Sequence, residues 1–99
     1  MELIDQFRYL VGGYYGVEYI DEYDLKVYVL KDIENYIKDF IEIYPIDNFN
    51  YKKEAEIVAN NTSLKTKLQD ALLVINKING PIELSLLIKK RLKELKDKK

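Results

Sequence analysis

The stretch "GGYYGVEYIDEYDLKVYVL", residues 12–30, holds five of the nine tyrosines of this 99-residue chain. In two runs, residues 14–20 and 25–30, β-branched and aromatic residues alternate with polar ones, and the runs flank "DEYD". Such alternation is typical of strands, and turn-forming residues between two alternating runs indicate a β-hairpin. The pattern therefore predicts a β-hairpin formed by these two runs.

The register of this hairpin is predicted from the pairing that puts like residues on the same face. A slip of one residue exchanges the two faces, and only one register gives a wholly apolar face and places Glu18 opposite Lys26 on the other. This register requires a loop of three or five residues, in which Asp21 or Asp24 takes a left-handed conformation. The apolar face is the predicted interface, formed by Tyr15, Val17, Tyr19, Leu25, Val27 and Val29.

Two helices are predicted on either side of the hairpin. Apolar residues at helical spacing predict a short helix over residues 3–11, which Gly12 and Gly13 then end. After the hairpin, Asp32 is placed to cap a helix that Pro45 stops. The apolar stripe of this second helix is unbroken and consists of Ile33, Tyr36, Ile37, Phe40, Ile41 and Tyr44.

Three further helices are predicted in the second half of the chain. One covers residues 51–60, and Thr62 or Ser63 caps the next, over residues 63–78. Asn79-Gly80-Pro81 follows, where glycine suits the end of one helix and proline the first turn of the next. The last helix carries its apolar residues between Leu84 and Leu95 and frays into "KDKK".

The sum is a single small α+β domain over residues 1–99, with about five helices and one hairpin. Two strands alone are marginally stable in water, and neither edge of this hairpin carries a proline that would prevent pairing with another strand. We therefore expect a homodimer, in which two hairpins form one four-stranded sheet across the two-fold axis.

Composition excludes several classes of enzyme. The chain contains no cysteine and no histidine, so it lacks disulfides, thiolate nucleophiles, the common zinc sites and catalytic triads that use histidine. The calcium-loop spacing of carboxylates is also missing. We predict a protein that is not an enzyme and that uses neither a metal ion nor a cofactor.

Hydropathy indicates a cytoplasmic protein. The longest strictly apolar run, residues 71–75, is far shorter than a membrane span. "MELIDQF" at the start has acidic residues where a signal peptide has basic ones. We expect neither a membrane span nor export by that route.

The charges are divided unevenly between the two halves of the chain. Residues 1–50 carry 4 basic and 11 acidic side chains, whereas residues 51–99 carry 12 basic and 6 acidic ones, although the net charge is only −1. The two halves should attract one another, either within one chain or between two chains.

Nucleic-acid binding is the alternative function. The two helices predicted within residues 51–78 have the shape of a helix-turn-helix, and a basic tail ends the chain. The plainer interpretation is two helices joined by a capping residue, followed by a solvated basic end that complements the helix dipole. The residues that would contact nucleic acid are Lys65, Thr66, Lys67 and Gln69 in the unit and Lys89, Lys90, Arg91 and Lys93 in the tail.

In its length and its "VGGYYGVEYIDEYDLKVYVL" segment, the chain resembles the small proteins of crenarchaeal filamentous viruses. The resemblance implies a thermostable viral protein of unassigned function, made in the cytoplasm of the host cell, with no catalytic residues to carry over. Together with the composition, it leads us to expect a non-enzymatic interaction protein that binds a second copy of itself or a host or viral protein.

Overall fold

The two runs predicted as strands are helical. The computed structural model describes residues 2–20, 22, 24–45 and 49–97, and within these ranges the chain forms five helices and no strand. The α+β class and the hairpin are therefore wrong, and the described part of the chain is all-helical. Asp21 and Tyr23 of the predicted turn lie outside the described residues, and Asp24 has right-handed, not left-handed, backbone angles. The helices are α1 (Leu3–Glu18), α2 (Leu25–Ile43), α3 (Tyr51–Asn61), α4 (Leu64–Lys77) and α5 (Ile82–Asp97).

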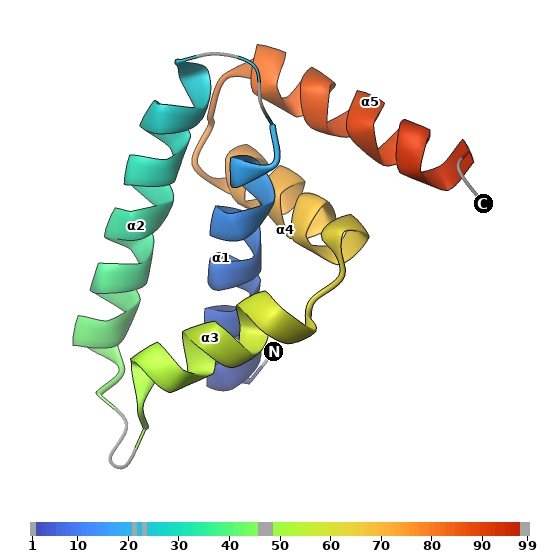
Figure 1. The fold of residues 1–99 in the computed structure, drawn as a ribbon. Helices are drawn as coiled ribbons and strands as arrows, with labels where there is room; N and C mark the ends of the chain where they lie inside the picture. The colour runs from blue at the N-terminus through green and yellow to red at the C-terminus, as the bar shows by residue number, and fades with distance from the viewer. Residues whose placement is uncertain (1, 21, 23, 46–48, 98–99) are drawn as a thin grey trace.

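Helix α1 lies at the centre of the arrangement. It packs against α2, α3 and α4, while α5 packs against α4 (Figure 1). Because α1 is surrounded by three helices, its buried residues are not confined to one stripe. They are Phe7, Leu10, Val11, Gly12, Gly13, Gly16 and Val17.

Three glycines let α1 approach α4 closely. A Cβ atom added at Gly16 would overlap the backbone carbonyl of Lys67 and would lie 3.0 Å from the Cβ of Ala71. One added at Gly13 would lie 2.8 Å from the Cγ2 of Val74. Glycine is unfavourable inside an isolated helix, by about 1 kcal/mol relative to alanine. Here the absence of side chains lets the two backbones come together, and so Gly12-Gly13 does not end the helix as predicted.

Helix α2 begins eight residues earlier than predicted. It starts at Leu25, so Asp32 lies exposed inside the helix and is not its cap. Val29, Ile33 and Phe40 are its buried residues, and their spacing of four and seven places them on one face. The prediction that Pro45 stops this helix is confirmed, since α2 ends at Ile43.

The ends of α3 and α4 follow the predicted chemistry more closely. The side chain of Asn50 accepts a hydrogen bond from the Lys53 N–H at 3.2 Å, and Ser63 accepts one from the Thr66 N–H at 3.2 Å. Ser63 is therefore the cap of α4, one of the two residues predicted for that role.

Asn79, and not Gly80, takes the left-handed position after α4. Asn79 has φ = 53°, and the Gly80 N–H donates a hydrogen bond to the Ile75 carbonyl at 2.8 Å. The Asn79 N–H also donates a hydrogen bond to the Asn76 carbonyl, and the two bonds together form a Schellman motif. Pro81 then precedes α5, and its carbonyl accepts the first helical bond, from Ser85.

Aromatic side chains join α2 and α3 to the start of α1. The Phe7 ring lies 6.1 Å from that of Phe40, 5.6 Å from that of Phe49 and 5.9 Å from that of Tyr51, measured between ring centres. The Tyr51 hydroxyl donates a hydrogen bond to the Tyr44 carbonyl at 3.0 Å. This cluster ties together the residues on both sides of the segment between α2 and α3.

Candidate interaction surface

Helix α2 leaves a groove along each of its flanks. Of the described helices, only α1 packs extensively against it, and the contact runs through the narrow face of Val29, Ile33 and Phe40. A helix that meets a single neighbour covers only part of its apolar surface. The remaining apolar residues of α2 therefore line the two grooves or face solvent.

The larger groove, here called the Tyr36 groove, has a volume of about 440 Å³. It lies between the first half of α1, the second half of α2 and the end of α4. Tyr36, Ile43 and Tyr44 are exposed along it, and Asp39 and Lys77 bring opposite charges to its lining. The full lining is Gln6, Tyr9, Leu10, Tyr36, Asp39, Phe40, Ile43, Tyr44 and Lys77.

The second groove, here called the Tyr14 groove, has a volume of about 280 Å³ and lies between α1, α2 and α3. The Tyr14 and Tyr15 rings meet edge to face, with their centres 5.4 Å apart. Burial raises the pKa of Tyr14, and the nearby carboxylates of Glu34 and Glu18 raise it further. Tyr14 is thus a neutral hydrogen-bonding group at neutral pH. The lining is Phe7, Val11, Tyr14, Tyr15, Glu34, Ile37, Ile41, Tyr51, Lys52 and Ala55.

Asp70 lies on α4 where that helix meets the glycines of α1. A Cβ atom added at Gly12 would touch its carboxylate. Burial raises the pKa of Asp70 to about 6. The pKa of Tyr9, in the neighbouring Tyr36 groove, is raised by burial and by the charge of Asp70.

The residues predicted to form the hairpin interface do not share a face. Val17 and Val29 are fully buried in the helical core, and Leu25 is half-buried. Val27 is 57% exposed on α2, and Tyr19 is 45% exposed after the end of α1. Tyr15 is half-buried and lines the Tyr14 groove. The predicted sheet-forming face therefore does not exist as one surface.

The predicted nucleic-acid residues of α4 are divided between the surface and the interior. Lys65, Thr66 and Gln69 are exposed, and Thr66 takes part in the helix cap. Lys67 is only 7% exposed, and its Nζ lies 5.3 Å from the centre of the Tyr19 ring, where a cation is attracted to the aromatic face. Helix α4 also packs between α1 and α5, so much of its surface is covered.

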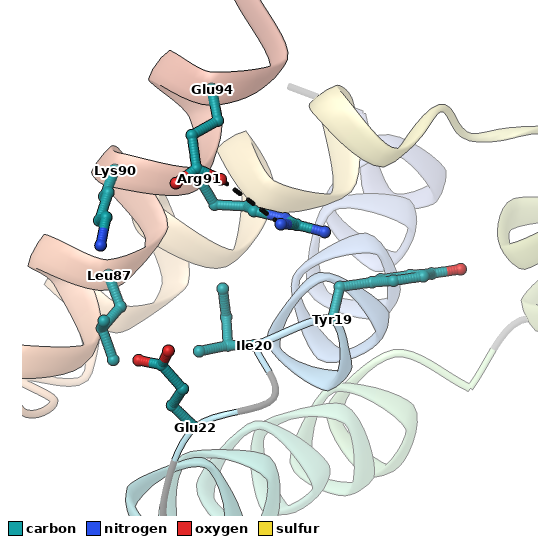
Figure 2. A pocket seen from close by; sticks show the side chains of 7 residues that line it. All are labelled: Tyr19, Ile20, Glu22, Leu87, Lys90, Arg91 and Glu94. Atoms are coloured by element: carbon teal, nitrogen blue, oxygen red, sulfur yellow. Dashed lines mark hydrogen bonds and ion pairs between the residues drawn. The ribbon is translucent and has the colours of Figure 1, made fainter.

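The predicted basic residues of the tail lie on two flanks of α5. Lys90 and Arg91 line a pocket of about 120 Å³ beside Tyr19, Ile20 and Glu22 (Figure 2). Arg91 also pairs with Glu94 at 3.4 Å. Lys89 and Lys93 are exposed and do not line this pocket.

Among the described residues, the ion pairs do not follow the division of charge between the two halves of the chain. Arg8 pairs with Asp5 in α1 at 4.0 Å and with Glu54 in α3 at 3.9 Å, and Arg91 pairs within α5. The pair between the halves, Arg8–Glu54, thus has the opposite polarity to the overall division of charge. Glu22 of the first half and Lys90 of the second half line the same pocket (Figure 2).

Sequence reasoning missed Asp39 and Ile43 in the Tyr36 groove. The width of the apolar stripe on α2 could have indicated an exposed surface, because six apolar residues occupy more of the helix surface than one neighbouring helix can bury.

Comparison with known proteins gave no match to a family model, a characterised protein or a solved structure. The resemblance to small crenarchaeal viral proteins therefore stays a prediction. Across the described residues, no helix is long and apolar enough to cross a membrane.

Proposed function

We propose that this protein is a non-enzymatic interaction module, which binds another protein chain through α2 and the Tyr36 groove. The observation that carries the proposal is the exposure of apolar side chains on a helix that packs extensively against only one other helix in the described part of the chain. Ile43 is 66% exposed and Tyr28 is 69% exposed, and both lie on α2. Exposed apolar groups next to a groove are typical of surfaces that bind other proteins.

The composition of the groove also supports a protein partner. Tyrosine is enriched in protein interfaces because it combines a large apolar ring with a hydroxyl group and has few rotatable bonds. Three tyrosines and two oppositely charged residues line the Tyr36 groove. The absence of histidine and cysteine from the chain makes a catalytic use of the groove less favourable.

The test is affinity capture from a lysate of the source cells, treated with nuclease, using the wild-type chain and Ile43→Glu. Ile43 is mostly exposed, so this variant should fold, but its carboxylate would oppose an apolar partner surface. Leu73→Glu is the matched control, because Leu73 is 55% exposed on α4 and lines neither groove. We expect the same protein to be retained by wild type and Leu73→Glu and lost from Ile43→Glu. Equal retention by all three chains contradicts the proposal.

The exposed lysines of α5 favour nucleic-acid binding as the second candidate function. Lys89, Lys93 and Lys96 lie on one strip of that helix, where they would meet phosphates. A gel-shift titration at low salt should then show binding that weakens steeply with salt and that Lys89→Glu reduces. Absence of a shift at micromolar protein rejects this candidate.

A further inference from the structure

The outer strip of α5 combines apolar and basic residues. Ile82, Leu86, Lys89, Lys93 and Lys96 follow one another at spacings of four and three, so they share one side of the helix. Ile82 is 68% exposed and Leu86 is 58% exposed, and the three lysines are exposed as well. The opposite side of α5, which includes Leu84 and Ile88, is buried.

The flank of α2 that borders the Tyr36 groove has the complementary composition. Asp32, Tyr36, Asp39 and Ile43 follow one another at the same spacings of four and three, and all four are exposed. Acidic and apolar residues thus alternate along this flank of α2, whereas the outer strip of α5 carries apolar and basic residues. The lengths also match, because at 1.5 Å per residue α5 is about 24 Å long and α2 about 28 Å.

This pair of surfaces does not meet within one chain. The residues that line the Tyr36 groove include none from the described part of α5. The C-terminal end of α2 and the C-terminal end of α5 lie at opposite corners of the molecule (Figure 1). A contact between these two surfaces would therefore have to join two molecules.

We propose that a second copy of this chain docks the outer strip of its α5 on the Tyr36 groove, with the two helices antiparallel. The proposal rests on the proposed function and names the partner as the chain itself. The residue spacing selects the orientation, because the antiparallel pairing places Ile82 against Ile43 and Lys93 against Asp32. In this register Leu86 lies opposite Asp39, and Lys89 lies opposite Tyr36, one helical turn from Asp39. The parallel pairing would instead place Ile82 against Asp32 and Lys93 against Ile43. Antiparallel helices also align their dipoles favourably.

The experiment is light scattering of the intact chain over a wide concentration range at low and high salt, for Asp32→Lys, Lys93→Glu and the double variant. Each single variant creates like charges at the contact, and we expect it to weaken self-association about tenfold. The double variant restores opposite charges with the polarity reversed and should recover association. Lys90→Glu is the matched control, since it makes the same change of charge on the other flank of α5 and should leave association unchanged.

The proposal is overturned if the mass remains 11.7 kDa, that of the single chain, at every concentration. It is also overturned if the single variants associate as well as the wild type, or if the double variant does not recover. A monomeric chain that still captures a cellular protein through Ile43 would reject self-docking and leave the proposed function standing. A monomer in which Lys93→Glu abolishes a gel shift would assign the strip to nucleic acid instead.

Discussion

The contact of α1 with α4 and the contact of α1 with α2 differ in the size of the side chains between the helices. Against α4, α1 presents Gly13 and Gly16, and the two backbones lie close together. Against α2, the contact is made by Val29, Ile33 and Phe40, which hold the helices apart and leave grooves on both flanks. The first contact is thus suited to holding the fold together, and the second leaves surface for a partner.

The largest expected effect comes from Gly16→Ala, which would break the close contact of α1 with α4. The added Cβ would meet the Lys67 backbone carbonyl, which cannot move without shifting α4. We expect the free energy of unfolding to fall by about 3 kcal/mol or more, as measured by urea denaturation.

Gly12→Ala is the matched control for this change. Its Cβ would meet only the carboxylate end of the Asp70 side chain, which can rotate away, and alanine favours the helix by about 1 kcal/mol. We expect nearly unchanged stability. Equal losses in both variants would show that the glycines do not differ in their contact with α4.

The next effect is expected from Asp70→Asn, at the same contact. The pKa of Asp70 is raised from 3.8 to about 6, so the folded state disfavours its charged form. The contribution of Asp70 to the free energy of unfolding is greatest below pH 3.8 and is lost as the pH rises toward 6. The shift corresponds to roughly 3 kcal/mol if taken in full, and partial exposure to solvent reduces it to about 1–2 kcal/mol.

The asparagine variant should therefore be more stable than wild type at pH 7, and the difference should vanish below about pH 4. Urea denaturation of both proteins at the two pH values measures this. A variant that is less stable than wild type at pH 7 would show that the Asp70 carboxylate makes a stabilising contact with α1.

A smaller effect on stability is expected at Asn79, in the turn that follows α4. The left-handed φ of 53° favours glycine, so Asn79→Gly should raise the free energy of unfolding by about 0.5 kcal/mol. The thermal midpoint should rise accordingly. Asn79→Ala should lower stability by about 1 kcal/mol, because a Cβ is disfavoured in this conformation. If both variants lowered the midpoint equally, the Asn79 side chain would have to stabilise the turn itself.

The smallest effect is expected from Val27→Asp, on the side of α2 opposite its buried residues. Val27 is mostly exposed, so the change should alter the free energy of unfolding by no more than about 0.5 kcal/mol. Val29→Asp is the positive control, because Val29 is buried and an unpaired charge there should unfold the protein. The hairpin prediction placed both residues on one buried face, and equal sensitivity of the two positions would restore that interpretation.

The sequence was sufficient to predict the helices whose ends carry clear chemical signals. Ser63 caps α4 and Pro45 stops α2, and the apolar spacing before Pro45 placed most of α2. The failure at residues 14–30 has a physical cause, because short runs such as "VEYI" and "LKVYVL" satisfy both an alternating and a helical spacing. The helical conformation of α1 lets Gly16 pack against the Lys67 backbone, and no local pattern reveals a contact between residues so far apart in the sequence.

The candidate surface was predictable only in part, for a related reason. Tyr36 and Tyr44 were placed on the α2 stripe, but which residues of a stripe stay exposed depends on where the neighbouring helix lies. The basic residues of α5 were recognised, whereas the separation of Lys90 and Arg91 from Lys89 and Lys93 required the position of Glu22 and Tyr19.

The glycines of α1 also bear on how the chain folds during synthesis. With three glycines in its 16 residues, α1 should have little helical structure on its own, because each glycine weakens an isolated helix. Its closest packing partner, α4, is made about fifty residues later, and ribosomes add residues in order from the N-terminus. Helix α1, which leaves the ribosome before α4, should therefore remain unfolded until α4 has emerged.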